Sequence, residues 1–235
     1  QRLNDYFGVA TDVVLDRRAM VDKFIGDAIM AVFGAPVQDP DHPAQACLAA
    51  LEMEAVLQEF YDQEAHPDRR PFQSRIGIHT GRIVVGNIGT QRRVDYTAIG
   101  DAVNVAARLE QANKQYGTRI LISQSTYDEA QSAIEAREID LLRVTGKETP
   151  IRIFEVVARK GALSPAQERG RESFEQGLSA YRRQRWARAR RAFMNVLEID
   201  PDDGPAAVYQ QRVEERAGEA LPSSWRGVHE MKVGK

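Results

Sequence analysis

The stretch MVDKFIGDAIMAVFGAP, residues 20–36, predicts a β-hairpin, because two apolar runs flank the pair Gly26-Asp27. Asp27 would then lie at the hairpin tip, beside a residue without a Cβ. A carboxylate in that position can bind a hard cation and lie close to a phosphate. Lys23, four residues earlier, could reach the same pocket. A Gly-Asp pair is also an ordinary turn, so this stretch alone assigns no function.

The composition is that of a globular chain with a sizeable core. The 235 residues are 43% hydrophobic, enough for one large or two small domains. The net charge is −2, from 32 basic and 34 acidic residues, so we expect no nucleic acid and no membrane surface as a bulk partner. Cys47, the only cysteine, lies among apolar residues at helical spacing and is expected in the core of a protein from a reducing compartment.

The sequence carries no recognisable membrane or export signal. No apolar run approaches the roughly 20 residues of a membrane span, and no basic-then-apolar signal segment opens the chain. We therefore expect the chain as given to be neither inserted nor secreted, and so cytoplasmic.

Helical and strand patterns alternate along a first domain, 1–159. We predict helices at 3–14, 44–61, 101–116 and 125–131, and strands at 21–25, 28–33, 72–80, 82–89, 94–99, 119–122, 134–144 and 151–157. The run 82–89 is apolar enough to be a central strand. Asp101 is expected to cap the third helix and Gly117 to end it. A turn at Gly146-Lys147 separates the last two strands.

A second, helical unit is predicted over 164–220, followed by a tail, 221–235. It resembles about one and a half tetratricopeptide repeats, in the spacing of Gly177, Ala189, Phe193 and Pro201. Such stacks usually need about three repeats to be stable alone, so we expect this unit to pack on the first domain or on another chain.

Arginines crowd the first two helices of this unit, and two readings of them stay open. They form a solvated helical face or a docking site for an acidic protein partner. The arginines are Arg182, Arg183, Arg185, Arg188, Arg190 and Arg191.

Asn104 and Arg108 lie four residues apart on the predicted helix 101–116, so they share one face, while Ala102, Ala106 and Leu109 point toward the core. A polar pair of this kind is either a solvated stripe or part of a site. An amide can orient a sugar, and a guanidinium can neutralise a phosphate.

Three segments, DKFIGDAIMAVFGAP, RIGIHTGRIVVGNIG and DYTAIGDAVNVAARLE, closely resemble in sequence and order the class III nucleotidyl cyclase catalytic domain. The resemblance covers roughly 1–157. It implies an α+β fold with a ferredoxin-like βαββαβ core, which works as a head-to-tail homodimer with active sites in the interface. It also implies two Mg²⁺ or Mn²⁺ ions per site and ATP as substrate.

The resemblance assigns roles to individual residues. Asp27 corresponds to the second of two metal-binding aspartates. Lys23 and Thr97 correspond to the residues that select the purine, and lysine with threonine is typical of the bacterial subclass that uses adenine. Asn104 corresponds to the residue that orients the ribose, and Arg108 to the one that stabilises the transition state.

Two positions near the phosphates are also assigned by resemblance. Arg82 corresponds to a phosphate-contacting arginine. Lys147 corresponds to a triphosphate contact, although the family often has Lys-Gly-Lys where this chain has Thr145-Gly146-Lys147.

The family's first metal aspartate belongs to a Phe-x-Asp-Ile strand that does not occur here, and Asp5, Asp12 and Asp22 are not in that context. We therefore assign none of them, and we expect this chain to be part of a longer polypeptide and nearly inactive by itself.

The leading hypothesis is an adenylyl cyclase in signal transduction. The alternatives are a guanylyl cyclase, disfavoured by Lys23, and a catalytically silent partner or nucleotide-binding module. Cyclases of this type commonly follow sensor or membrane domains, so the chain is also expected as the cytosolic part of a membrane-anchored sensor protein. No cyclase motif lies beyond residue 157, so the helical unit is expected to be dispensable for chemistry.

Overall fold

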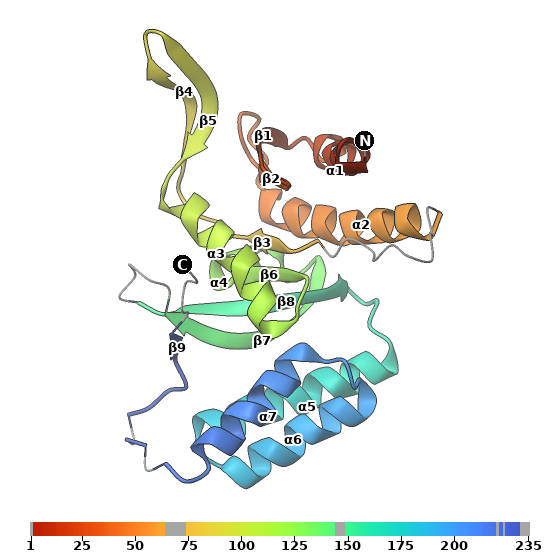
Figure 1. The fold of residues 1–235 in the computed structure, drawn as a ribbon, viewed down its shortest axis with the longest axis vertical. Helices are drawn as coiled ribbons and strands as arrows, with labels where there is room; N and C mark the ends of the chain where they lie inside the picture. Colours follow the sequence, from red (N-terminus) through yellow and green to blue (C-terminus); the bar gives the residue numbers. More distant parts are fainter. Residues whose placement is uncertain (1, 64–73, 144–148, 220, 223, 231–235) are drawn as a thin grey trace.

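The computed structural model describes residues 2–63, 74–143, 149–219, 221–222 and 224–230 (Figure 1). Along the chain, the elements are α1 (Arg2–Asp16), β1 (Met20–Ile25), β2 (Ala28–Val32), α2 (His42–Gln63), β3 (Ile76–Ile78), β4 (Val84–Thr90), β5 (Arg93–Ile99), α3 (Asp101–Tyr116), β6 (Ile120–Ser123), α4 (Gln124–Ala130), β7 (Ile134–Arg143), β8 (Ile151–Arg159), α5 (Pro165–Arg182), α6 (Trp186–Ile199), α7 (Gly204–Arg216) and β9 (His229–Glu230).

A mixed sheet forms the centre of the fold, with strand order β3-β6-β8-β7-β9. β3 runs parallel to β6, whereas β8 is antiparallel to both β6 and β7. The short strand β9 comes from the tail and pairs parallel with β7. The predicted α+β class is confirmed, and the finer βαββαβ description stays a prediction.

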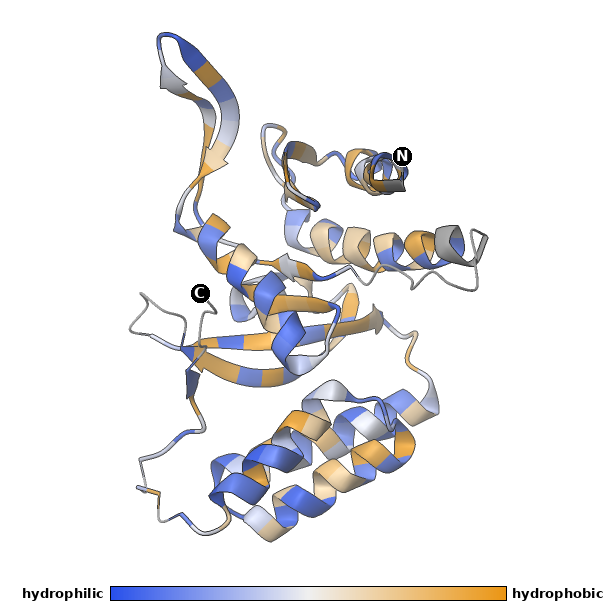
Figure 2. Ribbon diagram, in the orientation of Figure 1, coloured by the Kyte–Doolittle hydropathy of each residue, from blue (hydrophilic) through white to orange (hydrophobic). Residues whose placement is uncertain are grey.

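The two faces of this sheet belong to two different cores. Along β6, Leu121 faces the core under α3, whereas Ile120 and Ile122 face the core under α2 and α4. This alternation follows from the two-residue period of a strand. Figure 2 shows hydrophobic residues gathered in the strands and on the helix sides that meet them. Cys47 lies fully buried in the second core, as predicted, and burial raises the pKa of its thiol to about 12.

The helical unit packs on the sheet face that also carries α3. Its buried aromatic rings, Phe174, Phe193 and Tyr209, join Leu109 of α3 and Ile153 of β8 in one core. The prediction that this unit packs on the first domain is therefore confirmed (Figure 1). Its assignment to the tetratricopeptide repeats and the domain boundary at 159 stay predictions.

The strand β4 is not central, contrary to the prediction for 82–89. It pairs with β5 in a separate two-stranded sheet, which projects from the body as an arm (Figure 1). Val84 on this arm is 60% exposed, so the described residues do not bury it. An apolar strand is expected to be buried, but its composition does not show whether the same chain or another molecule buries it.

Two further predictions need correction. Asp101 does not cap α3, because Gly100 is the N-cap and Asp101 is the first helical residue, where its charge is favourable to the helix dipole. β3 is shorter than predicted, and residues 72–73 of the predicted strand lie outside the described residues. The predicted turn at Gly146-Lys147 also lies outside them.

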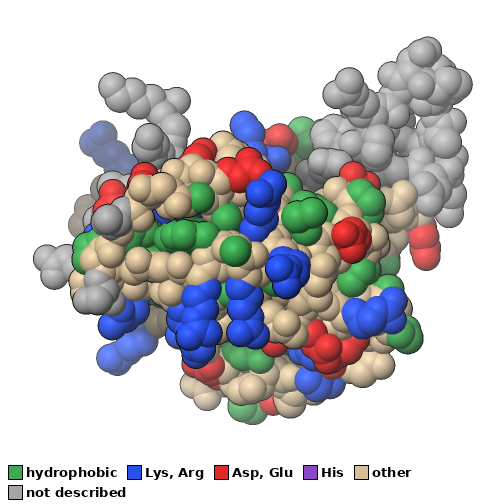
Figure 3. Space-filling model, turned by 90° about the horizontal axis from the view of Figure 1, so that it is seen from below, with side chains coloured by type: hydrophobic (Ala, Val, Ile, Leu, Met, Phe, Trp, Pro, Cys, Tyr) green, Lys and Arg blue, Asp and Glu red, His purple; other side chains and the backbone are tan. Residues whose placement is uncertain are grey.

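The arginines of the helical unit do not share one role. Arg182 points to the sheet, where its Nη2 atom lies 2.5 Å from Glu138 Oε1 on β7. The other five, Arg183, Arg185, Arg188, Arg190 and Arg191, are exposed. Figure 3 shows basic side chains beside a hydrophobic band on the lower face of the molecule.

Among the helices of the described ranges, none combines the length and apolar character that crossing a membrane requires.

Candidate active site

The hairpin β1–β2 places Asp27 at an exposed tip. Ile25 pairs with Ala28, which leaves Gly26 and Asp27 as the turn. Gly26 has φ +64°, a left-handed conformation that favours a residue without a Cβ. The hairpin and its acidic tip are therefore as predicted.

A β-bulge interrupts the same hairpin at Asp22. Val21 pairs with Ala31 and Lys23 pairs with Met30, so Asp22 has no partner residue on β2. In a regular strand, the neighbours Asp22 and Lys23 would point to opposite faces. A bulge changes the direction of side chains locally, and here Lys23 Nζ lies 3.9 Å from Asp22 Oδ2.

Thr97 of β5 meets the bulge from the other side. Its hydroxyl donates a hydrogen bond to Asp22 Oδ2 over 2.8 Å, and the Ala98 amide lies 3.4 Å from the same oxygen. Thr97 is 6% exposed, and the side chain of Asp22 is fully buried. The structure thus brings together Lys23 and Thr97, the two predicted purine-selecting residues, around one carboxylate.

Asp22 is the residue that the sequence reasoning missed. From the sequence, Asp22 is only one of three acids that do not match the family's first metal ligand. The available signal was an acid inside an apolar strand directly before Lys23, because a charge in such a position needs a partner. Nothing local in the sequence identifies Thr97, 75 residues away, as that partner.

Asn104 and Arg108 lie on the outer side of α3, as predicted. Asn104 is exposed and Arg108 half-buried, while Val105 and Leu109 are buried on the other side of the helix. At the start of α3, Gly100 packs on the backbone of Arg82: a Cβ there would lie 3.2 Å from the Arg82 carbonyl oxygen. Arg82 itself is exposed next to this helix start.

The predicted residues do not all meet within one chain. In the described part of the structure, no hydrogen bond or ion pair joins Asp27 to Asn104 or Arg108. Lys147 lies outside the described residues. A site that uses Asp27 together with the α3 pair would take one group from each of two chains.

Asp27 is suited to bind a divalent metal ion. Asp27 offers exposed carboxylate oxygens, the ligand type that Mg²⁺ and Mn²⁺ prefer. Within the described residues, however, no group of three or more His, Cys, Asp or Glu side chains could hold a metal ion. Asp27 fits as one ligand, and the remaining donors would come from outside this set.

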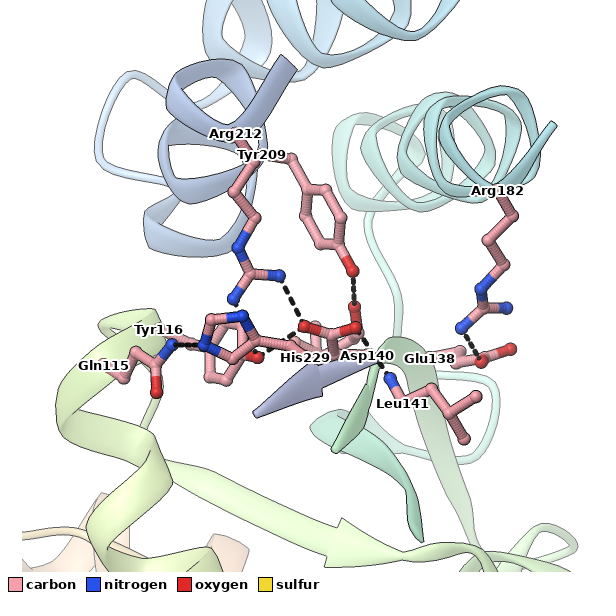
Figure 4. A network of polar contacts seen from close by, with 10 residues as sticks. Gln115, Tyr116, Glu138, Asp140, Leu141, Arg182, Tyr209, Arg212 and His229 are labelled. Atoms are coloured by element: carbon pink, nitrogen blue, oxygen red, sulfur yellow. Dashed lines mark hydrogen bonds and ion pairs between the residues drawn. The ribbon is translucent and has the colours of Figure 1, made fainter. Parts of the chain in front are cut away.

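The far end of α3 is fixed by a buried polar network (Figure 4). Tyr116 donates to Asp140 Oδ2 over 2.5 Å, and Arg212 Nη1 of α7 lies 2.5 Å from the same oxygen. The Leu141 amide donates to Oδ1, and Tyr209 donates to the carbonyl of Ile139.

The ionisation of this network follows from its burial. Burial and the neighbouring carboxylate of Asp140 raise the pKa of Tyr116, so its hydroxyl stays protonated as a donor. Burial lowers the pKa of Arg212, but the carboxylate of Asp140 and the neighbouring Tyr116 and Tyr209 together outweigh it, and the pKa is raised. The charged pair thus ties α7 of the helical unit to β7, and the Tyr116 hydroxyl, bonded to both partners, ties the helix that carries Asn104 and Arg108 to this pair.

Comparisons with known proteins agree with this architecture. The family model described as "Adenylate and Guanylate cyclase catalytic domain" matches residues 1–156. Adenylate cyclase 1 of Rhizobium meliloti is 38% identical over 155 residues, which are 66% of this chain and 23% of that protein. The terminal-differentiation specific adenylate cyclase of Dictyostelium discoideum is 34% identical over 215 residues, 89% of this chain and 10% of that protein.

A solved structure has the same fold. The adenylyl cyclase CyaB from P. aeruginosa superposes with a TM-score of 0.61 at 31% identity, over 69% of this chain and 83% of that chain. The present chain spans less than a quarter of the length of the two curated relatives. With a family match over most of the chain, and relatives that are adenylate cyclases, this chain belongs to the adenylate and guanylate cyclase catalytic domain family.

Proposed function

We propose that this chain is the catalytic domain of an adenylyl cyclase, which converts ATP to 3′,5′-cyclic AMP and pyrophosphate as a homodimer. The observation that carries the proposal is the placement of Lys23 and Thr97 on one buried carboxylate. The family includes guanylate cyclases as well, so membership alone does not show whether the substrate is ATP or GTP.

The chemistry of Lys23 supports adenine. A lysine ammonium only donates hydrogen bonds. The N1 atom of adenine accepts one, whereas N1 of guanine carries a hydrogen and would oppose the ammonium. Lys23 is only partly buried, with 46% of its side chain exposed, so it can reach a bound base.

In the reaction, the ribose 3′-oxygen forms a bond to the α-phosphorus while the bond from that phosphorus to the pyrophosphate oxygen breaks. The 3′-hydroxyl proton leaves to solvent or a base. Asn104 would orient the ribose, and Arg108 would donate to the phosphate oxygens as their charge grows. Arg82 and Lys147 would contact the phosphates. Two Mg²⁺ or Mn²⁺ ions, with Asp27 as one ligand, would supply Lewis-acid stabilisation of phosphate charge.

Exposed apolar side chains support the homodimer. Among the large hydrophobic residues of the described chain, several with half or nearly half of their surface exposed lie on the hairpin β1–β2 and on the arm β4–β5. They are Phe24, Ile25, Val84, Val94, Tyr96 and Ile99. A second copy that covered these strands would bury them and could bring Asp27 to the α3 pair of its partner.

The setting of the enzyme follows from the same proposal. Cyclic AMP is a signal, so the domain would act in signal transduction in the cytoplasm, alone or as the cytosolic part of a membrane-anchored sensor protein. The exposed arginines of α6 would be available to a protein partner.

The preference for ATP over GTP is tested by giving the full-length protein both nucleotides at equal concentration, with Mn²⁺. We expect cyclic AMP as the main product, and Lys23→Glu to lower kcat/KM for ATP at least about tenfold. The matched control is Lys114→Glu, the same charge change at an exposed position near the end of α3. Preferred formation of cyclic GMP by the unchanged protein would mean a guanylyl cyclase, and no product from either nucleotide would mean a silent domain.

Mixing two inactive variants tests whether each active site takes residues from both chains of the dimer. Asp27→Ala and Arg108→Ala are each expected to be nearly inactive. Mixed in equal amounts, they should regain up to about a quarter of the activity, because random pairing makes half the dimers mixed and each mixed dimer has one intact site of two. If subunits exchange and no activity returns, both residues belong to a site within one chain.

A further inference from the structure

A threonine hydroxyl both donates and accepts hydrogen bonds, so Thr97 by itself does not distinguish adenine from guanine. Adenine carries an amino group, a donor, at the position where guanine carries a carbonyl oxygen, an acceptor. The direction of the Thr97 proton therefore decides which base this residue favours.

Asp22 fixes that direction. An ionised carboxylate only accepts hydrogen bonds, and Asp22 Oδ2 lies 2.8 Å from the Thr97 hydroxyl oxygen. Thr97 therefore donates its single hydroxyl proton to Asp22. Toward any other group, the Thr97 oxygen can only accept. An acceptor pairs with the amino group of adenine and repels the carbonyl oxygen of guanine.

The same carboxylate also positions Lys23. Its Oδ2 atom lies 3.9 Å from Lys23 Nζ, and the β-bulge is what allows two consecutive residues to act on one pocket. Asp22 Oδ2 thus lies between the Thr97 oxygen, which can only accept a hydrogen bond from the base, and the Lys23 ammonium, which can only donate one. Adenine presents the complementary pair on its amino group and N1, and guanine presents the opposite pair.

The burial of Asp22 lowers the free energy of unfolding. Its side chain is fully buried, and among the described residues its Oδ1 atom has no hydrogen-bond partner. Buried polar atoms in native proteins are nearly always paired, so an unpaired one calls for an explanation, and a functional role is one such explanation. An unpaired buried carboxylate oxygen lowers stability, so packing alone does not account for an acid at this position.

We infer that Asp22 is a specificity-determining positioning residue: it turns the Thr97 hydroxyl into a hydrogen-bond acceptor and holds Lys23 beside it, so that the pocket matches adenine and opposes guanine. The inference rests on the proposed cyclase function of this site. Asp22 acts through Thr97 and Lys23 and need not touch the nucleotide.

The test compares ATP with GTP in the full-length protein carrying Asp22→Ala, by kcat/KM and by displacement of a fluorescent N-methylanthraniloyl-ATP. We expect the ATP-to-GTP ratio to fall at least about tenfold, because the free Thr97 hydroxyl can then donate to guanine. The control Asp95→Ala removes a largely exposed acid from β5, the strand that carries Thr97. Its ATP-to-GTP ratio should stay within about twofold of that of the unchanged protein.

A double variant separates positioning from a general loss of structure. If Asp22 acts through Thr97, then Asp22→Ala should change the ratio much less in a Thr97→Val protein than in the unchanged protein. Should Asp22→Ala not fold, Asp22→Ser keeps a small polar group that hydrogen-bonds Thr97 in either direction, and the ratio should fall in the same way.

Two results would overturn the inference: a folded Asp22 variant that keeps its ATP-to-GTP ratio within about twofold, or one that loses both nucleotides equally. The displacement experiment does not need turnover. Absence of cyclase activity would therefore refute the proposed function, while the affinity ratios would still decide the role of Asp22.

Discussion

Arg212→Met should be among the most destabilising single changes in this chain. Arg212 Nη1 lies 2.5 Å from Asp140 Oδ2, and the side chains of Arg212 and Asp140 are 10% and 1% exposed. The guanidinium also lies over the Tyr116 and Tyr209 rings, 5.4 Å and 5.1 Å from their centroids. Methionine keeps part of this packing but leaves the carboxylate without its cation.

The expected loss follows from the burial of the remaining charge. Removing one partner of a buried ion pair typically lowers the free energy of unfolding by about 3–5 kcal/mol. Asp140 keeps two donors, the Tyr116 hydroxyl and the Leu141 amide, so we expect the lower end, about 3 kcal/mol. A domain of marginal stability would lose a large part of its total with this one change.

Urea unfolding measures the loss and also which parts unfold together. The only tryptophans, Trp186 and Trp225, both lie in the C-terminal part of the chain, so their fluorescence reports the helical unit, whereas far-ultraviolet circular dichroism reports the whole chain. Because the helical unit and the sheet share a core, the two signals should change at the same urea concentration.

Arg190→Met is the matched control. Arg190 lies 3.7 Å from Glu214, but both side chains are mostly exposed, so the loss should be below about 1 kcal/mol. In an Asp140→Asn/Arg212→Met protein, part of the stability should return, because no buried charge is left unpaired. An Arg212→Met loss no larger than that of the control, or a fluorescence change well before the circular dichroism change, would refute this reasoning.

Three further outcomes can be checked. Gly177→Ala should lower stability by about 1–3 kcal/mol, because its Cβ would lie 2.6 Å from the Phe193 ring, whereas Gly170→Ala on the same helix meets nothing within 4 Å and should be neutral or stabilising; thermal unfolding compares the two. Cys47, with its pKa near 12 and no exposure, should react with a thiol reagent only after unfolding, and rapid labelling of the native protein would contradict its burial. Deleting 164–235 should give an aggregating chain rather than the functional one expected from sequence, because it uncovers a core face; a soluble, monodisperse truncation would be the contrary result.

Local patterns in the sequence were enough to place the elements. The hairpin followed from a glycine and an acid between apolar runs, and α3 followed from its period and from Gly117, whose φ of +69° ends the helix. These signals lie within a few residues of the structure they specify.

Long-range pairing was not predictable in the same way. The contact of Asp140 with Arg212 joins residues 72 apart, and an arginine at helical spacing looks the same whether it faces water or a buried acid. The bulge at Asp22 is a similar case, because only the register of the two strands makes one residue unpaired. The prediction of 82–89 as a central strand was wrong because apolar residues of β4, such as Val84, have no cover among the described residues.

The helix α3 connects two parts of the molecule as a stiff rod. Arg108 and Tyr116 lie eight residues apart on it, about 12 Å at the usual rise of 1.5 Å per residue. A helix this short does not bend easily, so a displacement of α7 that carries Tyr116 along would carry Arg108 as well. A shift of about 1 Å in a catalytic group can change a rate about a hundredfold. Under the proposed role of Arg108, a force applied to the outer helices of this chain would change the rate at the nucleotide, and the contact between Arg212 and the Tyr116 hydroxyl would transmit it.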